Sequence, residues 1–287
     1  MKKALRGDAL ERVQDLIARE AGAPLRGDAE RELASILGAA APVVAGASDG
    51  NFLSREVTIV LADLRGFTAI SEAYAATVVL ELLNRYLVRM SEIIFRHSGT
   101  IDKFMGDSIM VLFGAPVGHE DDVRRAVACA VEMQVAMTEI NRHHKQQGMP
   151  ELFMGIGINT GAVMAGLLGS DLYSEYTVIG DEVNLTSRIE AFSLRGQVLI
   201  SQNTFERCRD FIRAGDPMDV HVKGKVNPVS LREVLAIPSL SAEVPRQEIR
   251  RSPRIEVKIT FSYQVVKSKI VVPQMHQGTI RDISYHG

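Results

Sequence analysis

The sequence predicts an α+β domain with a mainly antiparallel sheet over residues 52–237, and two observations favour this class. Strand-like apolar segments alternate with helix-like amphipathic segments along this part of the chain. The 287 residues are 46% hydrophobic and 24% charged, which is the balance of a protein that can bury a core. The length suggests two domains, or one domain with extensions.

Each element of this domain is predicted from its hydrophobic period and its end signals. The expected order is a buried strand at 55–64, a long helix at 77–99, two short strands around a turn at 105–107, a helix at 119–148, a glycine-punctuated strand pair at 151–169, a helix at 180–194 and a closing hairpin at 219–236. Helices that cover one face of an antiparallel sheet give the α+β class.

Three further regions flank this domain. Residues 1–51 carry two short amphipathic helix patterns, which we expect to pack on the next domain or on a second subunit. Residues 238–247 hold two prolines and no periodicity, so they are a candidate linker. Residues 248–287 are basic and rich in strand-like alternation, which indicates the beginning of a different domain that is cut off before its core closes.

Charge and cysteine content exclude several classes of protein. The chain has 33 basic and 35 acidic residues, so the net charge of −2 gives no general reason to expect nucleic acid as a partner. Cys129 and Cys208 form no CxxC motif, which argues against a disulfide framework or a structural zinc site and fits a reducing cytoplasm. The stretch 34–47 is too short to span a bilayer, and we expect no membrane span.

Two aspartates stand out at the ends of predicted strands. Asp63 ends the strand in "LADLRGFT", and Asp107 lies at the tip of the hairpin "IDKFMGDSIMVLFG" (101–114). Two carboxylates about 4 Å apart repel by roughly 4 kcal/mol at an effective dielectric constant of about 20, so a cation should lie between them. Either aspartate alone is more simply a turn residue, but together they favour Mg²⁺ or Mn²⁺.

Five stretches together resemble the class III nucleotidyl cyclases, in that family's order and spacing. They are "LADLRGFT" (61–68), "IDKFMGDSIMVLFG" (101–114), "GIGINTG" (155–161), "YTVIGDEVNLTSRIE" (176–190) and "VKGK" (222–225). The resemblance implies a ferredoxin-like catalytic domain over 52–237. It also implies that Asp63 and Asp107 bind two Mg²⁺ or Mn²⁺ ions per active site.

The resemblance also assigns the substrate. Lys103 and Thr177 match the pair that reads the purine; lysine donates to adenine N1, and the threonine oxygen accepts from the 6-amino group. Guanylate cyclases of the family resemble a Glu/Cys-type pair, so this pair implies ATP. Many family members have aspartate at the position of Thr177, and losing that charge could loosen purine selectivity.

The remaining site residues follow from the same motifs. Asn184 and Arg188 share one face of a helix and match the residues that position the ribose and stabilise charge on the attacked phosphate. Lys223 matches the lysine on the triphosphate tail. The phosphate oxygens would be held by the backbone amides at a helix start, those of Gly66, Phe67 and Thr68.

The family builds each site from two catalytic domains, and this chain carries one. We therefore expect a head-to-tail homodimer with two sites, in which one subunit supplies Asp63 and Asp107 and the other supplies the purine, ribose and phosphate residues. Two-metal chemistry then converts ATP to cyclic AMP and pyrophosphate.

The C-terminal segment resembles the PilZ domain, which binds cyclic di-GMP. "RRSPR" (250–254) matches its RxxxR motif through Arg250 and Arg254, and "DISYHG" (282–287) matches its second motif. In the second motif the matching residues are Asp282, Ser284 and Gly287. Arginines of this kind grip phosphate and stack on guanine, so cyclic di-GMP is a candidate regulator. A basic linker followed by a chance turn would give the same pattern.

Three other functions remain open. The chain could be a non-catalytic scaffold whose PilZ-like part binds cyclic di-GMP, although every catalytic position holds a competent side chain. It could be a guanylate cyclase, which Lys103 and Thr177 oppose, or a diguanylate cyclase, which the lack of a GGDEF-like stretch opposes. Identifying the nucleotide product separates these functions.

Overall fold

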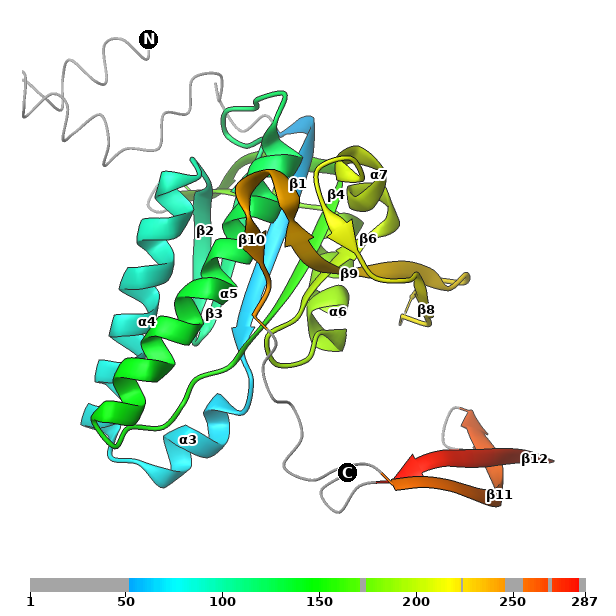
Figure 1. Ribbon diagram of the computed structural model, residues 1–287. Coiled ribbons are helices and arrows are strands. Elements are labelled where there is room, and N and C mark those ends of the chain that lie inside the picture. The colour runs from blue at the N-terminus through cyan, green and yellow to red at the C-terminus, as the bar shows by residue number, and fades with distance from the viewer. Residues whose placement is uncertain (1–51, 171–173, 223, 246–254, 268–269, 284–287) are drawn as a thin grey trace, which may run out of the picture.

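The computed structural model describes residues 52–170, 174–222, 224–245, 255–267 and 270–283 (Figure 1). The N-terminal helices predicted within 1–51 lie outside these residues. The elements of the first unit are β1 (Leu53–Leu64), α3 (Phe67–Ala73), α4 (Ala76–Arg96), β2 (Thr100–Met105), β3 (Ser108–Phe113), α5 (Asp122–Gln146), β4 (Met154–Gly169), β5 (Ser174–Ile179), α6 (Asp181–Phe192), β6 (Val198–Ser201), α7 (Gln202–Cys208), β7 (Arg213–Ala214), β8 (Met218–Val220), β9 (Val229–Ile237), η1 (Pro238–Leu240) and β10 (Ala242–Glu243).

The sheet is mainly antiparallel, as the sequence predicts. Its strands follow the order β10-β9-β6-β4-β1-β3-β2, with β5 paired to β4 and both β7 and β8 paired to β9. The pairing of β4 with β6 is parallel, whereas β1 pairs antiparallel with both β3 and β4. The α+β class is therefore confirmed.

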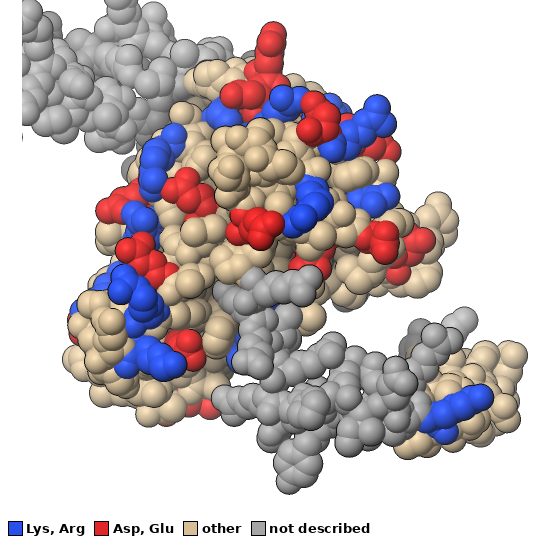
Figure 2. Space-filling model, in the orientation of Figure 1, with Lys and Arg blue, Asp and Glu red and all other residues tan. Residues whose placement is uncertain are grey.

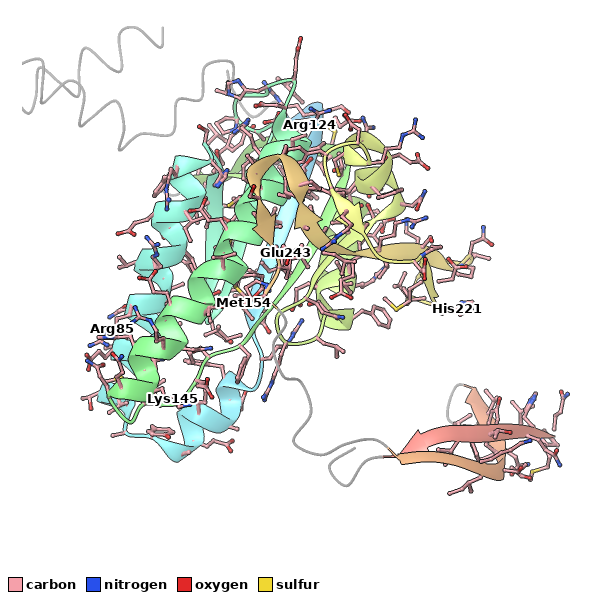
Figure 3. The ribbon with its side chains drawn as sticks, viewed as in Figure 1. Arg85, Arg124, Lys145, Met154, His221 and Glu243 are labelled. Carbon is pink, nitrogen blue, oxygen red and sulfur yellow. The ribbon has the colours of Figure 1, made fainter. Side chains whose placement is uncertain are left out.

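Alternate residues of the central strands point to opposite faces of the sheet. Helices α4 and α5 lie side by side across one face (Figure 1), where Tyr86, Met90 and Ile94 pack against Val60 and the neighbouring strands. Met154 lies in this core (Figure 3), and its sulfur accepts a hydrogen bond from the Tyr86 hydroxyl at 3.3 Å. These two helices thus cover one face of the central strands.

Helix α6 packs on the opposite face, against β4. A Cβ atom on Gly157 would lie 2.4 Å from the backbone nitrogen of Glu190, and one on Gly161 would lie 2.7 Å from the Glu182 side chain. The glycines of β4 therefore permit close approach of α6.

Two expectations differ from the structure. Residues 151–169 were predicted as a strand pair, which is wrong, because β4 runs as one strand from Met154 to Gly169. Its glycines mark the contact with α6 and not a turn. The predicted linker 238–247 begins later than expected, since Ala242 and Glu243 of β10 pair with β9.

The charged side chains of the described residues are mixed in sign on the face that Figure 2 shows. Among the described residues, no helix is both long enough and apolar enough to cross a membrane.

A second unit follows residue 254. It is an antiparallel pair of long strands, β11 (Ile255–Lys267) and β12 (Ile270–Ile283). This agrees with the strand-like pattern predicted there, but the described residues form two strands and no barrel.

Candidate functional site

The two aspartates predicted to bind metal lie on neighbouring strands at one end of the sheet. Asp63 is the second-last residue of β1, and Asp107 directly precedes β3, the antiparallel neighbour of β1. Ser108 donates its hydroxyl hydrogen to Asp63 Oδ1. Burial raises the pKa of Asp107, and the negative charge of Asp63 raises it further. The structure therefore brings the two carboxylates close enough to interact electrostatically.

An arginine links this pair to helix α6. The Arg65 Nη1 atom lies 3.2 Å from Asp63 Oδ2, and Nη2 donates to the Ser193 hydroxyl at 2.8 Å. The same guanidinium forms an ion pair with the Glu190 carboxylate. Burial raises the pKa of Glu190, and the positive charge of Arg65 lowers it. The sequence analysis did not assign Arg65 and Glu190, although both lie within the quoted family stretches.

A buried phenol in the core carries a pKa shift that the two aspartates contribute to. Tyr86 of α4 is fully buried, and burial raises its pKa above the usual value for tyrosine. The charges of Asp63 and Asp107 raise this pKa further. The phenol remains neutral at physiological pH and cannot compensate their charge.

These donors fit a divalent cation that shares its ligands with a phosphate. Among the described residues there is no group of three or more His, Cys, Asp or Glu side chains that could hold a metal by itself. Mg²⁺ is usually bound by one or two carboxylates together with substrate phosphates and water. Because the negative charge of Asp63 disfavours the charged form of Asp107, a cation between the two carboxylates would relieve that repulsion.

The predicted purine-reading residues also meet, through a third side chain. Thr177 of β5 donates its hydroxyl hydrogen to Asp102 Oδ2 at 3.2 Å. Lys103 Nζ lies 3.6 Å from the same oxygen and 3.0 Å from Glu175 Oε1. Hydrogen bonding to Glu175 raises the pKa of Lys103, so this lysine is a cation at neutral pH. The sequence analysis did not consider Asp102, although it is a polar residue in an apolar run.

The predicted ribose and phosphate residues lie on α6, one turn apart. Asn184 is exposed, and Arg188 is half-buried. Arg188 Nη1 is buried and has no hydrogen-bond partner among the described residues. A Cβ atom on Gly224 would lie 3.4 Å from Arg188 Nη2, so Gly224 of the "VKGK" stretch lies against this guanidinium. A buried cationic donor without a partner is suited to an anionic ligand.

The predicted phosphate-binding groups are described only in part. Lys223 lies outside the described residues, and its neighbour Lys225 pairs with Asp181 of α6. The Lys225 hydrogen bond lowers the pKa of that exposed carboxyl group. Gly66 precedes α3 with a φ of 77°, so Phe67 and Thr68 begin a helix as expected. Their role toward phosphate stays a prediction.

The predicted cyclic di-GMP residues are not brought together among the described residues. Arg250, Arg254, Ser284 and Gly287 lie outside these residues. Only the backbone of Asp282 is described, and it pairs with Glu256 in the β11–β12 hairpin.

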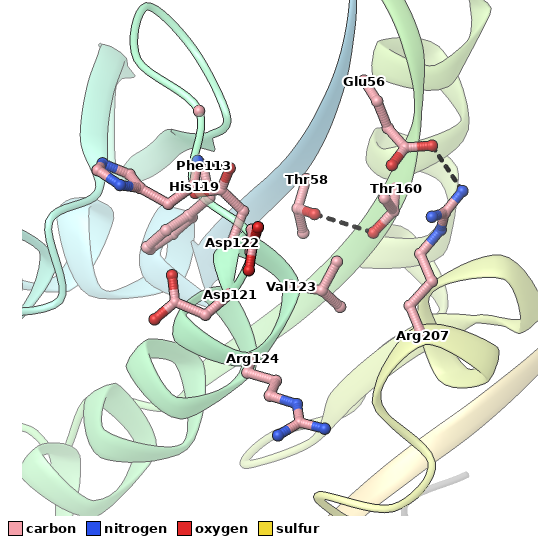
Figure 4. A pocket seen from close by; sticks show the side chains of 12 residues that line it. Glu56, Thr58, Phe113, His119, Asp121, Asp122, Val123, Arg124, Thr160 and Arg207 are labelled. Carbon is pink, nitrogen blue, oxygen red and sulfur yellow. Dashed lines mark hydrogen bonds and ion pairs between the residues drawn. The ribbon is translucent and has the colours of Figure 1, made fainter.

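A separate cavity of about 1080 Å³ lies near the other end of β1 (Figure 4). Thr58 and Thr160 share a hydrogen bond of 3.0 Å there, and Arg207 pairs with Glu56 at the rim. None of the predicted site residues lines it. The candidate site is therefore not this cavity.

Comparison with known proteins agrees with the geometry. The family described as "Adenylate and Guanylate cyclase catalytic domain" matches residues 53–232. Adenylate cyclase 1 of Rhizobium meliloti is 30% identical over 199 residues, which cover 67% of this chain and 30% of that protein. An adenylate cyclase of Anabaena cylindrica is 34% identical over 192 residues, covering 64% of this chain and 37% of that protein. The chain thus spans about a third of the length of these relatives.

Solved structures include enzymes of both nucleotide specificities. The guanylyl cyclase Cya2 is 43% identical with a TM-score of 0.66, covering 68% of this chain and 100% of that chain. The adenylyl cyclase CyaB from P. aeruginosa is 36% identical with a TM-score of 0.63, covering 70% of this chain and 99% of that chain. By its motifs, its fold and these matches, the chain belongs to the adenylate and guanylate cyclase catalytic domain family.

Proposed function

We propose that this domain is an adenylate cyclase, which converts ATP to 3′,5′-cyclic AMP and pyrophosphate as a homodimer. The observation that carries the choice of ATP is the meeting of Lys103 and Thr177 around Asp102. A lysine donor and a threonine oxygen acceptor match adenine N1 and the 6-amino group. Guanine offers a protonated N1 and an oxygen at position 6, which suits this pair poorly.

Each predicted site residue would have a separate role in the cyclisation of ATP. Asp63 and Asp107 would hold divalent cations, and Ser108 orients the Asp63 carboxylate by its hydrogen bond. Arg188 offers its unpartnered Nη1 to the phosphate where negative charge develops during attack by the ribose 3′-hydroxyl. Asn184 positions the ribose. The bond to the α-phosphate forms as the bond to pyrophosphate breaks, so no side-chain nucleophile is needed.

The cations would be Mg²⁺ or Mn²⁺, two per site. When bound, such a pair lowers the pKa of the attacking hydroxyl and neutralises the leaving pyrophosphate. Both functions need Asp63 and Asp107 in their ionised form.

Exposed apolar side chains near the site support the homodimer. They lie on the β2–β3 hairpin and along β4 and β5, where Phe104 is 47%, Met164 is 43% and Ile179 is 47% exposed. Exposed apolar side chains of this kind are available for burial in an interface. The proposed head-to-tail dimer would bury them and bring Asp63 and Asp107 of one subunit to the nucleotide-reading residues of the other.

A guanylate cyclase is the second candidate. The 43% identity to the guanylyl cyclase Cya2 favours it, because this identity exceeds the 36% to the adenylyl cyclase CyaB. Regulation by cyclic di-GMP through residues 248–287 and a cytoplasmic location also remain predictions from the sequence.

The product test separates the candidates. The purified chain is incubated with ATP or GTP and Mg²⁺ or Mn²⁺, and the product is identified by mass. Cyclic AMP as the main product is the expected result. Cyclic GMP as the main product would reject ATP as the substrate, and no product with any pair would favour the scaffold.

A further inference from the structure

A buried carboxylate lies directly behind the residues that read the purine. The Asp102 side chain has 0% of its surface exposed, and its Oδ1 has no hydrogen-bond partner among the described residues. Burying such a group costs stability unless its interactions compensate. Burial accordingly raises the pKa of Asp102, while the Thr177 hydrogen bond and the Lys103 charge lower it.

Burial keeps the Asp102 carboxylate out of contact with the purine base. The Lys103 side chain is 33% exposed and the Asp102 side chain is 0% exposed, so the lysine can touch a purine and the Asp102 carboxylate cannot. Thr177 is nearly buried as a whole residue, and its hydroxyl lies between Asp102 and the proposed position of the base. Any effect of Asp102 on the nucleotide therefore passes through its neighbours.

The hydrogen bond at 3.2 Å fixes the direction of the Thr177 hydroxyl. Thr177 donates its one hydroxyl hydrogen to Asp102 Oδ2, which accepts it. The lone pairs of Thr177 Oγ1 are then the groups left for the base. These lone pairs can accept a hydrogen bond from the adenine 6-amino group. Guanine O6 is itself an acceptor, so no hydrogen bond forms between it and these lone pairs.

We propose that Asp102 is a positioning residue for purine selection, which holds the Thr177 hydroxyl as an acceptor and so discriminates against a 6-oxo purine. This inference rests on the proposed function. Without Asp102, the hydroxyl could rotate and donate to guanine O6, and threonine alone would then read either purine.

The test is the ratio of kcat/KM for ATP to kcat/KM for GTP. In Asp102→Asn the amide can donate to Thr177, which frees the threonine hydrogen for guanine O6. We expect the ratio to fall by about 3- to 10-fold, the range for one hydrogen bond. Asp102→Ala removes the acceptor altogether and should lower the ratio as well, which covers the case in which one variant fails to fold.

Two controls separate positioning from a structural role. Glu175→Gln removes the other carboxylate beside Lys103 but leaves the Thr177 hydrogen bond, so the ratio should not fall. In a Thr177→Val background, Asp102→Asn should leave the ratio unchanged, because the hydroxyl it acts on is absent. Circular dichroism and size-exclusion chromatography check the folding of each variant.

The outcomes are distinct. If both Asp102 variants slow ATP and GTP turnover equally, Asp102 is structural and the inference is wrong. An equal fall in Glu175→Gln would also overturn it, since the effect would run through the charge of Lys103. Wild-type protein that prefers GTP would reject the proposed function itself, before any variant is compared.

Discussion

At the scale of single residues, the candidate site places charge where water is partly excluded. Asp107 is half-buried beside Asp63, and both factors raise its pKa. A carboxyl whose pKa is higher in the folded than in the unfolded protein destabilises the fold once it ionises. The ionised carboxyl lowers the free energy of unfolding at pH values above its folded-state pKa. This loss of stability is absent at pH values below its unfolded-state pKa.

Asp107→Asn should therefore stabilise the protein in metal-free buffer. At pH 7 we expect a gain of at most about 1 kcal/mol, or about 2–4 °C in Tm, because solvent screens this partly exposed group. The gain should shrink as the pH is lowered toward 4. Differential scanning calorimetry with EDTA measures it, and the exposed Asp216→Asn is the control. An unchanged or lower Tm at pH 7 would contradict the expectation.

Arg188→Ala should reduce turnover more than binding. The buried Nη1 without a described partner would act on charge that develops during attack. Loss of one such donor lowers kcat by about 10²- to 10³-fold with little change in KM. Steady-state kinetics with ATP test this, and Arg207→Ala at the separate cavity is the control. A raised KM with normal kcat would instead make Arg188 a binding residue.

At the scale of elements, the position of α6 depends on glycines in β4. Gly157 lies against the backbone of Glu190, and the same helix carries Asn184 and Arg188. A side chain at position 157 would move α6 and with it both residues.

Gly157→Ala should lower stability and activity together. A Cβ atom there would lie 2.4 Å from a backbone nitrogen, and overpacking of this kind costs about 1–3 kcal/mol. Urea unfolding and the cyclase assay measure the two effects. Gly215→Ala is the control, because its nearest neighbour would be 3.9 Å away. Equal effects of the two substitutions would show that the contact with α6 does not matter.

At the scale of the whole molecule, the proposed function assigns the domain residues for two different halves of a site. The aspartates predicted to bind metal gather at the β1–β3 end, and the residues predicted to read the nucleotide lie on β2, β5 and α6. If each site draws one half from each subunit, the monomer is inactive and complementary variants can restore activity.

Mixing Asp107→Ala with Lys103→Ala should restore activity that neither variant has alone. Each heterodimer would hold one intact site, so an equal mixture should regain about a quarter of the wild-type activity. Cyclic AMP is measured after heterodimers are verified by differently tagged subunits. No recovery in verified heterodimers would exclude sites shared between subunits.

The sequence by itself determined the fold class, most element positions and the family. Hydrophobic period and helix end signals depend on neighbouring residues, so they can be read along the chain, and five motifs in register identified the cyclase domain. The error at 151–169 arose because glycine signals a turn locally but permits helix contact in the fold. Only the tertiary structure decided that Asp102 joins Lys103 and Thr177, and that Arg65 joins Asp63 and Glu190. These contacts connect separate strands and a helix, and side-chain burial exists only once those elements pack together.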